Sequence, residues 1–540
     1  MDRRPNKLIP DDLPPVPGLD ALEATTVVVG EATGDVEAIG VAVYTDGEVP
    51  ATLGFDRAGL EDAGFTGAAG SSLVLARSGA PDLVAIGLGD RAEVSPRVLR
   101  DASATLVRAA ARRSRIAFQV DDLAGVDGAE AVRALAEGAL LASYRYTVLN
   151  GSSKHVALTG FTIVLASAVD GAEAATAEAV VSARTAVVAR DLANTPPGHL
   201  TAVNMGEIAV DLGERFGFEV ELFDKAALIE LGCGGLLGVN QGSVEEPRMI
   251  KLSYAPAGEA AGHLGLVGKG IMYDSGGISL KPSDPMHLLM KMDMGGAAAV
   301  LGAFTGLRDA GVTTRVTGWL MCTDNMPSGL SYKLGDVLTA RGGTTIEVKN
   351  TDAEGRLVMS DALVLANEDG VDAIIDIATL TGAALVSLGP ATAPVLGNDQ
   401  GMVDLVREAS AAVDESVWQL PLEQKYRKQL DSEIADIANL GGPFAGATTA
   451  ALFLAHFVGA TPWAHLDIAG TMQSEKDDSW RTAGATGFGA RILLEAARGF
   501  RPDARAQPRH SRRASRTAPR RLRRSRGSRP WPRPPRASTA

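Results

Sequence analysis

The segment 349–361 (KNTDAEGRLVMSD) combines residue types that suit chemistry better than regular structure. Asp352 and Glu354 flank a single alanine, and Gly355 and Arg356 follow directly. In an extended segment the side chains of residues i and i+2 point the same way, whereas on a helix they lie about 200° apart. The spacing therefore predicts two carboxylates that converge on one point from an extended loop.

Further charged residues follow two other apolar runs of the sequence. Lys269 ends the run HLGLVGKG, Asp274 and Lys281 follow in IMYDSGGISLKP, and Asp293 lies in KMDMGG. Glycines accompany each of these residues and allow the backbone to approach a bound ion or substrate closely. Carboxylates gathered at the ends of buried strands repel one another unless positive charge lies among them. Two divalent cations, roughly 3.5–4 Å apart and bridged by shared carboxylates, would supply that charge and hold a water for attack.

Other kinds of site find less support in the sequence. Any one of these acids taken alone is most simply a solvated loop residue, so the argument depends on the whole set. The sequence contains no HExxH pairing, no Cys/His cluster of zinc-finger spacing and no GxSxG motif. His465, in WAHLDIAG, is predicted to be a buried, hydrogen-bonded core residue and not a ligand. Carboxylate oxygens favour hard cations such as Mn²⁺ or Mg²⁺ and leave Zn²⁺ open.

Short β-branched runs alternate with alanine-rich helical stretches along the chain, which predicts an α/β fold with a largely parallel sheet. A long alanine-rich helix ends at Pro196 and Pro197 and indicates a domain boundary near residue 190. We predict a smaller N-terminal α/β domain over 1–189. A larger catalytic α/β domain over 190–498 is expected to have a central, mostly parallel mixed sheet flanked by helices. Its buried strands are expected at 217–224, 248–254, 263–270, 313–322, 371–383 and 463–470.

The composition of the 540 residues is that of a globular protein long enough for two large domains. The two cysteines cannot form a disulfide framework, and the first residues have no apolar core of signal-peptide length. No run of 18 or more apolar residues occurs, so no membrane span is expected. These features predict a cytoplasmic location.

Charge is distributed unevenly along the chain. From Arg501 onward there are 14 arginines and one acid, a balance of +13. Since the net charge of the whole chain is −13, residues 1–500 carry −26. An acidic body argues against nucleic acid as the main ligand. The Arg/Pro/Ser-rich tail, 499–540, is predicted to be disordered. It is either an arm for nucleic acid or an anionic surface, or a dispensable extension, such as one read in a shifted frame of GC-rich coding sequence.

Several blocks of the sequence resemble the leucyl aminopeptidases, the cytosol aminopeptidase family of dimetal exopeptidases. The blocks are NTDAEGRL, VGKGIMYDSGGISLKP, KMDMGGAAAV and IATLTGA, with support from RDLANTPP and WAHLDIAGT. The resemblance is strong from about residue 190 to 495 and weak before it. It implies five metal ligands for two divalent cations per subunit, Mn or Zn: Lys269, Asp274, Asp293, Asp352 and Glu354. Lys269 would ligate as a neutral amine, which requires a strongly lowered pKa.

The same resemblance implies the roles of six further residues. Lys281 would stabilise the negative charge of the tetrahedral intermediate, and Arg356 would hold a bicarbonate that acts as general base. The substrate pocket would be lined by Met290, Thr379, Leu380 and Gly382. Three departures from the family pattern are a gap between Lys281 and Asp293 that is one residue longer than expected, Leu334 in place of a proline, and an end that deviates after Gly487.

The resemblance also implies an activity and its setting. The expected function is removal of the N-terminal residue, preferably leucine or another apolar residue, from peptides with a free N-terminus in intracellular peptide turnover. A homohexamer is expected, without membrane association, and nucleic acid is expected as a partner only through the basic tail. Two rival hypotheses are a DNA-binding or regulatory protein, supported by the tail alone, and an inactive structural member. The inactive alternative is opposed by seven filled ligand and catalytic positions.

Overall fold

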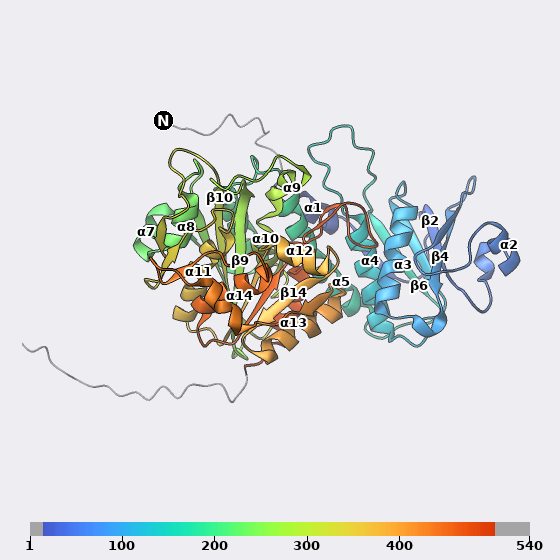
Figure 1. Ribbon diagram of the computed structural model, residues 1–540. Coiled ribbons are helices and arrows are strands. Elements are labelled where there is room, and N and C mark those ends of the chain that lie inside the picture. The colour runs from blue at the N-terminus through green and yellow to red at the C-terminus, as the bar shows by residue number, and fades with distance from the viewer. Residues whose placement is uncertain (1–13, 503–540) are drawn as a thin grey trace, which may run out of the picture. The chain divides into compact units, whose positions relative to one another are not determined.

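The computed structural model describes residues 14–502, which contain two large sheets and two small ones (Figure 1). The predicted tail, 499–540, lies outside the described residues from position 503 onward. Within 14–502 no helix is both long and apolar enough to cross a membrane.

The N-terminal part is built on a six-stranded sheet whose strands are parallel except for β3, which is antiparallel to β4. In spatial order the strands are β1 (Thr26–Val29), β6 (Gly160–Leu165), β5 (Arg115–Val120), β2 (Ala38–Tyr44), β4 (Asp82–Gly89) and β3 (Ser72–Leu75). The helices α3 (Pro96–Ala109) and α4 (Gly128–Ser143) supply most of the helical side of its main core. Ser95 and Asp127 cap these two helices by accepting hydrogen bonds from backbone N–H groups of their first turns.

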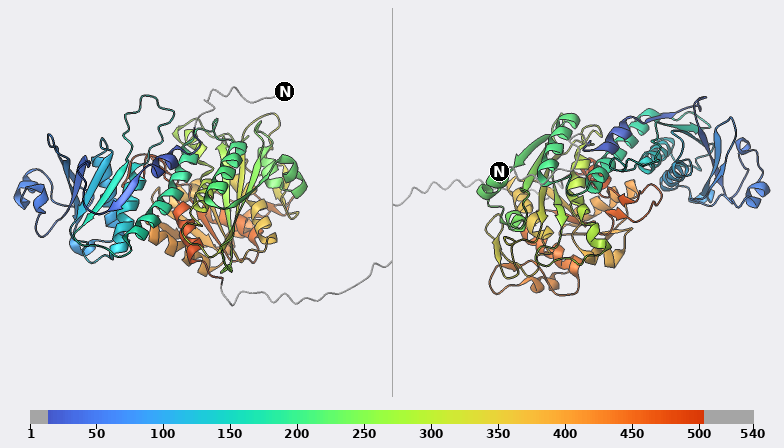
Figure 2. Two further views of the ribbon diagram at one scale, coloured as in Figure 1. Left: turned by 180° about the vertical axis from the view of Figure 1, so that it is seen from behind. Right: turned by 90° about the horizontal axis from the view of Figure 1, so that it is seen from above.

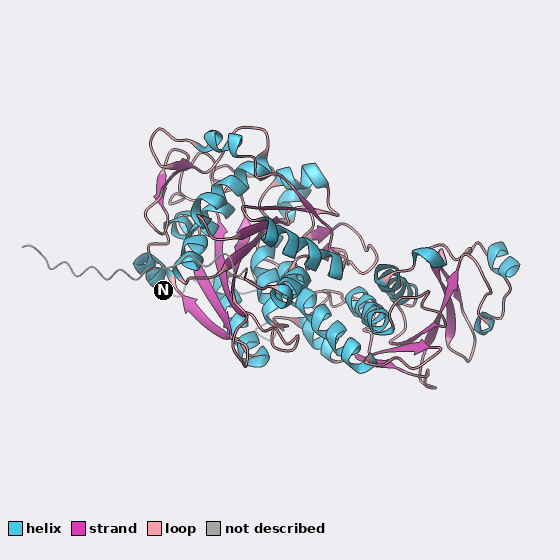
Figure 3. Ribbon diagram, turned by 90° about the horizontal axis from the view of Figure 1, so that it is seen from below, coloured by secondary structure: helices cyan, strands magenta, loops and turns pink. Residues whose placement is uncertain are grey.

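The C-terminal part, predicted from the sequence to be catalytic and called the catalytic part below, is built on an eight-stranded mixed sheet flanked by helices (Figures 2 and 3). In spatial order its strands are β15 (Val417–Gln419), β14 (Ala393–Gly397), β17 (Trp463–Asp467), β13 (Ala373–Ala378), β9 (His263–Asp274), β10 (Arg315–Asn325), β8 (Arg248–Tyr254) and β7 (Glu219–Phe223). The four central strands β17, β13, β9 and β10 are parallel, and antiparallel pairs occur on both sides of them. The predicted mostly parallel mixed sheet with flanking helices is confirmed.

Alternate residues of β9 enter different cores. Leu264 and Leu266 pack with residues of α6 (Ala202–Phe216), α10 (Gly295–Phe304), α13 (Gln400–Val413) and α15 (Ala490–Gly499). Val267 and Ile271 pack on the opposite side with α8 (Gly234–Asn240), α11 (Gly355–Glu368) and α14 (Gly446–Val458). Lys269 has the parity of this second set, so the period-2 alternation of the strand directs its side chain toward the face that α11 covers.

The helix α5 (Ala172–Asn194) packs against both α4 and α10. Of these, α4 contributes to the core of the six-stranded sheet and α10 to the core of the eight-stranded sheet. The expected boundary at residue 190 falls inside this helix. Val16 and Leu19, at the start of the short helix α1 (Pro17–Glu23), pack within the core of the catalytic sheet. The division into 1–189, 190–498 and 499–540 therefore stays a prediction.

All the strands expected in the catalytic part are present, although the run 371–383 is divided. β13 ends at Ala378, and α12 (Gly382–Leu388) begins after a short turn. Four strands of the two large sheets, β2, β6, β14 and β15, were not predicted. The first three are short apolar runs, a pattern that does not by itself distinguish a strand from a buried helical segment.

Candidate active site

The charged residues predicted from the sequence gather where the four central parallel strands end. Asp274 is the last residue of β9, and Asn325 and Asp467 end β10 and β17. Thr379 directly follows β13. Parallel strands present their carboxyl ends at one edge of a sheet, where ligand sites of α/β proteins collect. The position of the cluster is thus a consequence of the strand order.

Three of the predicted acids converge. Asp274, Asp352 and Glu354 each offer one carboxylate oxygen, and these oxygens lie within 4.8 Å of one another. Asp274 and Glu354 are buried, whereas Asp352 is partly open to solvent. Convergence was predicted, but the predicted extended loop was wrong. Asp352 lies in a turn, and Glu354 has helical dihedral angles (φ −76°, ψ −36°) at the start of α11.

The turn is held from both sides by backbone and side-chain hydrogen bonds. Asn350 Oδ1 accepts a bond from the N–H of Asp352 (2.8 Å), and Thr351 Oγ1 donates to the carbonyl of Gly276 (2.7 Å). The carbonyl of Thr351 accepts a bond from Asn325 Nδ2 (2.9 Å). The loop that carries Asp352 is therefore attached to the segment that follows β9.

Two lysine side chains lie among the carboxylates. Lys269 Nζ is 2.9 Å from both Asp293 Oδ1 and Glu354 Oε1, and it donates to the carbonyl of Thr379 (2.8 Å). Lys281 Nζ is 2.7 Å from Asp274 Oδ2 and also pairs with Asp352. The five predicted ligand positions and Lys281 thus form two ion-pair groups, which adjoin where the carboxylate of Glu354 lies beside those of Asp274 and Asp352.

Gly355 makes room for this arrangement. A Cβ atom at this position would lie 2.7 Å from Lys269 Nζ and 2.6 Å from the Cε atom of the same side chain. Any larger residue would have to displace the buried lysine from the carboxylates. The close backbone approach expected beside the charged residues is present here.

Burial dominates the electrostatics of the acids. It raises the pKa of Asp274 to about 6, assisted by the neighbouring Glu354 carboxylate and opposed by Lys281 and Lys269. Burial also raises the pKa of Asp293 well above its usual value, and that of Asp352 is raised in the same direction. Glu354 differs, because the two lysines outweigh its burial and lower its pKa.

The same network raises the pKa of Lys269. Burial lowers it, but Asp293 and Glu354 outweigh that effect, and the pKa lies above the usual value. The residues alone therefore do not produce the neutral amine that ligation requires. Added positive charge beside the carboxylates would act in the required direction, since it would disfavour the ammonium form.

Two carboxylate oxygens of the cluster lack a hydrogen-bond donor in the part of the chain that the structure describes. Asp293 Oδ2 and Glu354 Oε2 are buried and have no hydrogen-bond partner among the described residues. Unpaired buried charge is costly, so these atoms call for a cation. The donor set is carboxylate oxygens and an amine, which suits Mn²⁺, Mg²⁺ or Zn²⁺. On these observations the residues fit a divalent metal site.

Arg356 is a buried cation next to this cluster. It is the second residue of α11 and is 5% exposed. Burial lowers its pKa to about 10, against the opposing effects of Glu354 and Asp467. Its Nε and Nη1 atoms have no acceptor among the described residues. A guanidinium with free donors at a helix N-terminus is suited to an anion.

The four predicted pocket residues lie along the segments next to the cluster. Thr379 Oγ1 donates to Asp293 Oδ1 (2.8 Å), and the carbonyl of Met290 accepts a bond from the N–H of Asp293 (3.3 Å). The N–H of Leu380 donates to Asp467 Oδ1 (3.1 Å), and Gly382 is an exposed residue at the start of α12. Thr379 and Met290 therefore touch a predicted ligand directly.

Two family models match the chain. The catalytic-domain model of the cytosol aminopeptidase family matches residues 187–494, and its N-terminal-domain model matches residues 56–152. The protein belongs to the cytosol aminopeptidase family. It is therefore an enzyme, a metal-dependent peptidase that acts at the N-terminus of peptides.

Similarity to individual proteins supports the assignment of this chain to the cytosol aminopeptidase family. A probable cytosol aminopeptidase of Alkaliphilus metalliredigens is 40% identical over 80% of this chain and 89% of its own length. One from Clavibacter michiganensis is 39% identical over 86% of this chain and 96% of its own. Among solved structures, the bottromycin maturation enzyme BotP in complex with Mn is similar, with a TM-score of 0.79 and 36% identity. That match covers 86% of this chain and 99% of BotP.

Two residues that hold the site of this aminopeptidase were not predicted. Asn325 Nδ2 donates to Asp274 Oδ1 (2.8 Å), and Asp467 accepts bonds from the N–H groups of Leu380 and Thr381. Asn325 follows the strand predicted over 313–322 by three residues, a position like that of Asp274 after the strand predicted over 263–270, whereas Asp467 lies inside the strand predicted over 463–470. His465 is buried and bonded through Nδ1 to Asp376 Oδ1 (2.5 Å), which confirms the core role predicted for it.

Proposed function

We propose that the cluster holds two divalent cations, Mn²⁺ or Zn²⁺, and that the enzyme removes N-terminal leucine and other apolar residues. The observation that carries the proposal is the convergence of three carboxylates beside buried oxygens without partners. Asp274 and Glu354 would bridge the two ions. Lys269 and Asp293 would complete the tighter site, and Asp352 would complete the exchangeable one.

When bound, such a pair of ions supplies Lewis acidity and a nucleophilic water at neutral pH. The chain itself contributes position and charge. Lys281, held beside Asp274 and Asp352, would donate a hydrogen bond to the oxygen that becomes negative as the peptide carbonyl is attacked. Arg356, with two unpaired donor atoms, would hold a bicarbonate suited to act as general base.

Substrate selection would come from both ends of the site. The free amino group of the substrate would take a ligand position at the metal-loaded site, which restricts cleavage to the first residue. Met290, Thr379, Leu380 and Gly382 would line the pocket for its side chain. The longer connection between Lys281 and Asp293 includes the short helix α9 (Pro285–Leu288) and bears directly on the shape near Met290.

Exchange of single ligands tests the metal proposal. We expect Asp352→Asn and Glu354→Gln each to abolish hydrolysis of leucine-p-nitroanilide and to lower bound metal, measured by elemental analysis, while the circular dichroism spectrum stays unchanged. Glu368→Gln, the same exchange at the exposed end of α11, is the matched control and should stay fully active. Wild-type turnover by either ligand variant at limiting metal would exclude the dimetal site.

We also propose a cytoplasmic homohexamer engaged in peptide turnover, which the names of the relatives support as to location. Light scattering should give a hexamer with or without residues 503–540, and a fully active monomer near 55.9 kDa would contradict this assembly. Short peptides with a free N-terminus should be cleaved and their N-acetylated forms left intact. Cleavage of the acetylated forms would contradict the requirement for a free amine.

A further inference from the structure

A small basic cavity lies in the N-terminal part, remote in sequence from the catalytic residues. It has a volume of about 60 Å³ and is lined by the ends of α3 and α4, the start of β5 and the segment 155–158. Four of its lining side chains are basic, and none of its lining residues is acidic: Arg108, Arg113, Arg145 and His155. Since a water needs about 10–15 Å³ of such volume, the cavity admits about four to six heavy atoms, the size of a small oxyanion.

Two of these arginines share a single carboxylate. Arg108 Nη1 and Arg145 Nη2 each lie 2.6 Å from the same atom, Asp477 Oδ2. Burial lowers the pKa of Arg108, Asp477 raises it, and the charge of Arg145 lowers it further. Arg113 is already paired with Asp82 (2.7 Å). The cavity therefore keeps an excess of positive charge that one carboxylate only partly neutralises.

Asp477 belongs to the catalytic part, in the loop 475–483 between β18 (Gln473–Ser474) and β19 (Gly484–Ala485). Arg108 also holds the backbone of this loop, because its Nε donates to the carbonyl of Ser479 (2.7 Å) and its Nη2 to that of Arg481 (2.6 Å). One arginine that lines the cavity thus makes three contacts to the loop.

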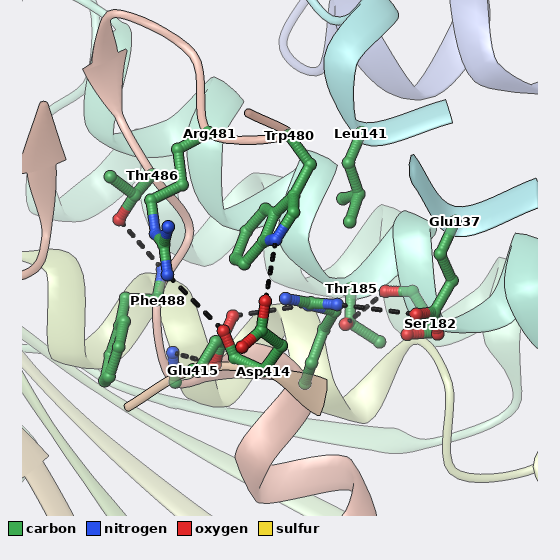
Figure 4. A network of polar contacts seen from close by, with 12 residues as sticks. Glu137, Leu141, Ser182, Thr185, Asp414, Glu415, Trp480, Arg481, Thr486 and Phe488 are labelled. Carbon is green, nitrogen blue, oxygen red and sulfur yellow. Dashed lines mark hydrogen bonds and ion pairs between the residues drawn. The ribbon is translucent and has the colours of Figure 1, made fainter. Parts of the chain in front are cut away.

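The loop is also anchored by Trp480, which is buried (Figure 4). Its ring lies under the guanidinium of Arg491 at 4.2 Å, and its Nε1 donates to Asp414 Oδ2 (3.5 Å). A displacement of the loop would therefore change the surroundings of the indole ring and with them its fluorescence.

The base of the hairpin reaches the candidate active site. The N–H of Thr486 donates to the carbonyl of Met472 (2.9 Å), and Met472 packs so closely on Gly295 that a Cβ there would lie 2.7 Å from Met472 Cγ. Gly295 is two residues after the proposed ligand Asp293.

A second connection passes through Asn194. Its Oδ1 accepts a bond from the N–H of Ala485 in β19 (3.0 Å), and its carbonyl accepts one from Lys291 Nζ (2.7 Å). The hairpin is therefore linked to residues on both sides of Asp293.

We propose that the cavity is a regulatory site for a small oxyanion, which competes with Asp477 for Arg108 and Arg145 and so releases the loop 475–483. Oxyanions such as phosphate, bicarbonate and acetate form the same charge-assisted bonds to guanidinium groups as a carboxylate does. The Asp477 side chain is 36% exposed, and its Oδ1 accepts a bond from the N–H of Ala483 in the same loop (3.0 Å), so Oδ2 can exchange the two guanidinium groups for water without losing that bond. Release of the loop removes support for Met472 and lowers peptidase activity. This regulatory effect rests on the proposed function, whereas binding in the cavity does not.

Fluorescence of Trp480 tests binding without requiring catalysis. The full-length protein is titrated with phosphate, bicarbonate or acetate, with chloride holding the ionic strength constant, and Trp480→Phe identifies the contribution of this residue. We expect a saturable change for at least one oxyanion, and the anion that produces it identifies the source. The metal-loaded enzyme should lose about fivefold in kcat over the same concentrations.

Two variants separate the cavity from general salt effects. Arg145→Gln removes one of the two cations, and Ala111→Phe fills the cavity while leaving both arginines in place. Both should lose the anion response, and Ala111→Phe should keep the resting fluorescence. Arg112→Gln is the matched control, because Arg112 is exposed and does not line the cavity, and it should respond like the wild type.

Three results would overturn the proposal or its parts. No oxyanion response beyond that of chloride, or a response that persists in both Arg145→Gln and Ala111→Phe, excludes the anion site. A fluorescence response without a change in kcat excludes the regulatory effect. Absence of activity in the metal-loaded wild type would count against the proposed function instead, and the fluorescence titration would still decide the cavity.

Discussion

Two buried charge clusters of this protein have opposite compositions. At the junction of α3, α4 and α15, Glu137 (labelled in Figure 4) accepts a hydrogen bond from Arg100 Nε (2.9 Å) and lies 2.8 Å from its Nη2. Glu137 also pairs with Arg133 and Arg491. Burial raises the pKa of Glu137, but the three arginines outweigh it and hold the value at about 2. In the candidate site the balance is reversed, since the carboxylates outnumber the lysines and the pKa of Asp274 rises to about 6.

The difference shows which kind of buried charge indicates function. Excess cations at the junction find neutral partners. Arg190 donates to the carbonyls of Leu141, Trp480 and Thr486, and Arg491 lies over the ring of Trp480. In the candidate site Asp293 Oδ2 and Glu354 Oε2 have no donor among the described residues, and carbonyls and aromatic faces cannot serve them because these are themselves negative. This acid-rich cluster therefore requires a cation, whereas carbonyls and an indole ring supply partners for the excess arginines of the junction.

Paired variants of the two clusters give the largest expected effects. Glu137→Gln leaves three arginines without their carboxylate and should destabilise the protein by about 3–5 kcal/mol, seen as a lower unfolding temperature. Asp352→Asn should remove activity without any such loss in metal-free protein. The pKa of Asp352 is raised, so its ionised form costs stability at neutral pH, and asparagine avoids that cost.

The comparison would fail if both variants destabilised the protein equally. It would also fail if Glu137→Gln lost activity at temperatures where it remains folded. Circular dichroism melts and leucine-p-nitroanilide assays on the same samples distinguish these outcomes.

An intermediate effect on activity is expected from a substitution of Arg356. This cation lies beside the acid-rich cluster, and two of its donor nitrogens have no acceptor among the described residues. Arg356→Ala should lower kcat by about 100-fold, because it loses the holder of a general base and keeps every proposed metal ligand. Added bicarbonate or a carboxylate should restore part of the activity. A loss as complete as that of Glu354→Gln in every buffer, or no response to added anions, would contradict the anion role.

The smallest effect is expected at Asp191, a buried acid whose hydrogen-bond donors are all neutral. Its oxygens accept bonds from the N–H groups of Gly18 and Leu19 and from the hydroxyl of Tyr144, and burial raises its pKa to about 7. Because the pKa in the folded state exceeds that in the unfolded state, its contribution to stability is fully present below pH 3.8. That contribution is lost as the pH rises through 7.

Comparison of the wild type with Asp191→Asn isolates the pH-dependent contribution of this carboxylate to stability. The unfolding temperature of the wild type relative to the variant should fall between pH 5 and pH 8. A difference that is constant with pH, or that rises, would show that the neutral donors suffice to keep the carboxylate ionised.

Much of the site could be predicted from the sequence because its acids and lysines follow recognisable apolar runs. The sequence did not reveal the residues that hold the site in place by hydrogen bonds. Asn325 and Asp467 are separated from the groups they hold by 51 and 87 positions. The conformation of Asp352 and Glu354 was also mispredicted, since the bond that Asn350 accepts from Asp352 and the bond that Thr351 donates to Gly276 fix a turn that local spacing does not specify.

By itself the sequence determined the alternation of strands and helices, the identity of the charged residues and the short spacings that bring Asp352 near Glu354. Only the tertiary structure decided which charges meet. The order β17-β13-β9-β10 brings the ends of four strands together, and Gly355 lets α11 approach Lys269. Burial and distance set pKa values and repulsion, and both arise from contacts between residues far apart in the chain. The sequence therefore specifies the charged groups, but the excess of buried acid that requires a cation exists only in the folded protein.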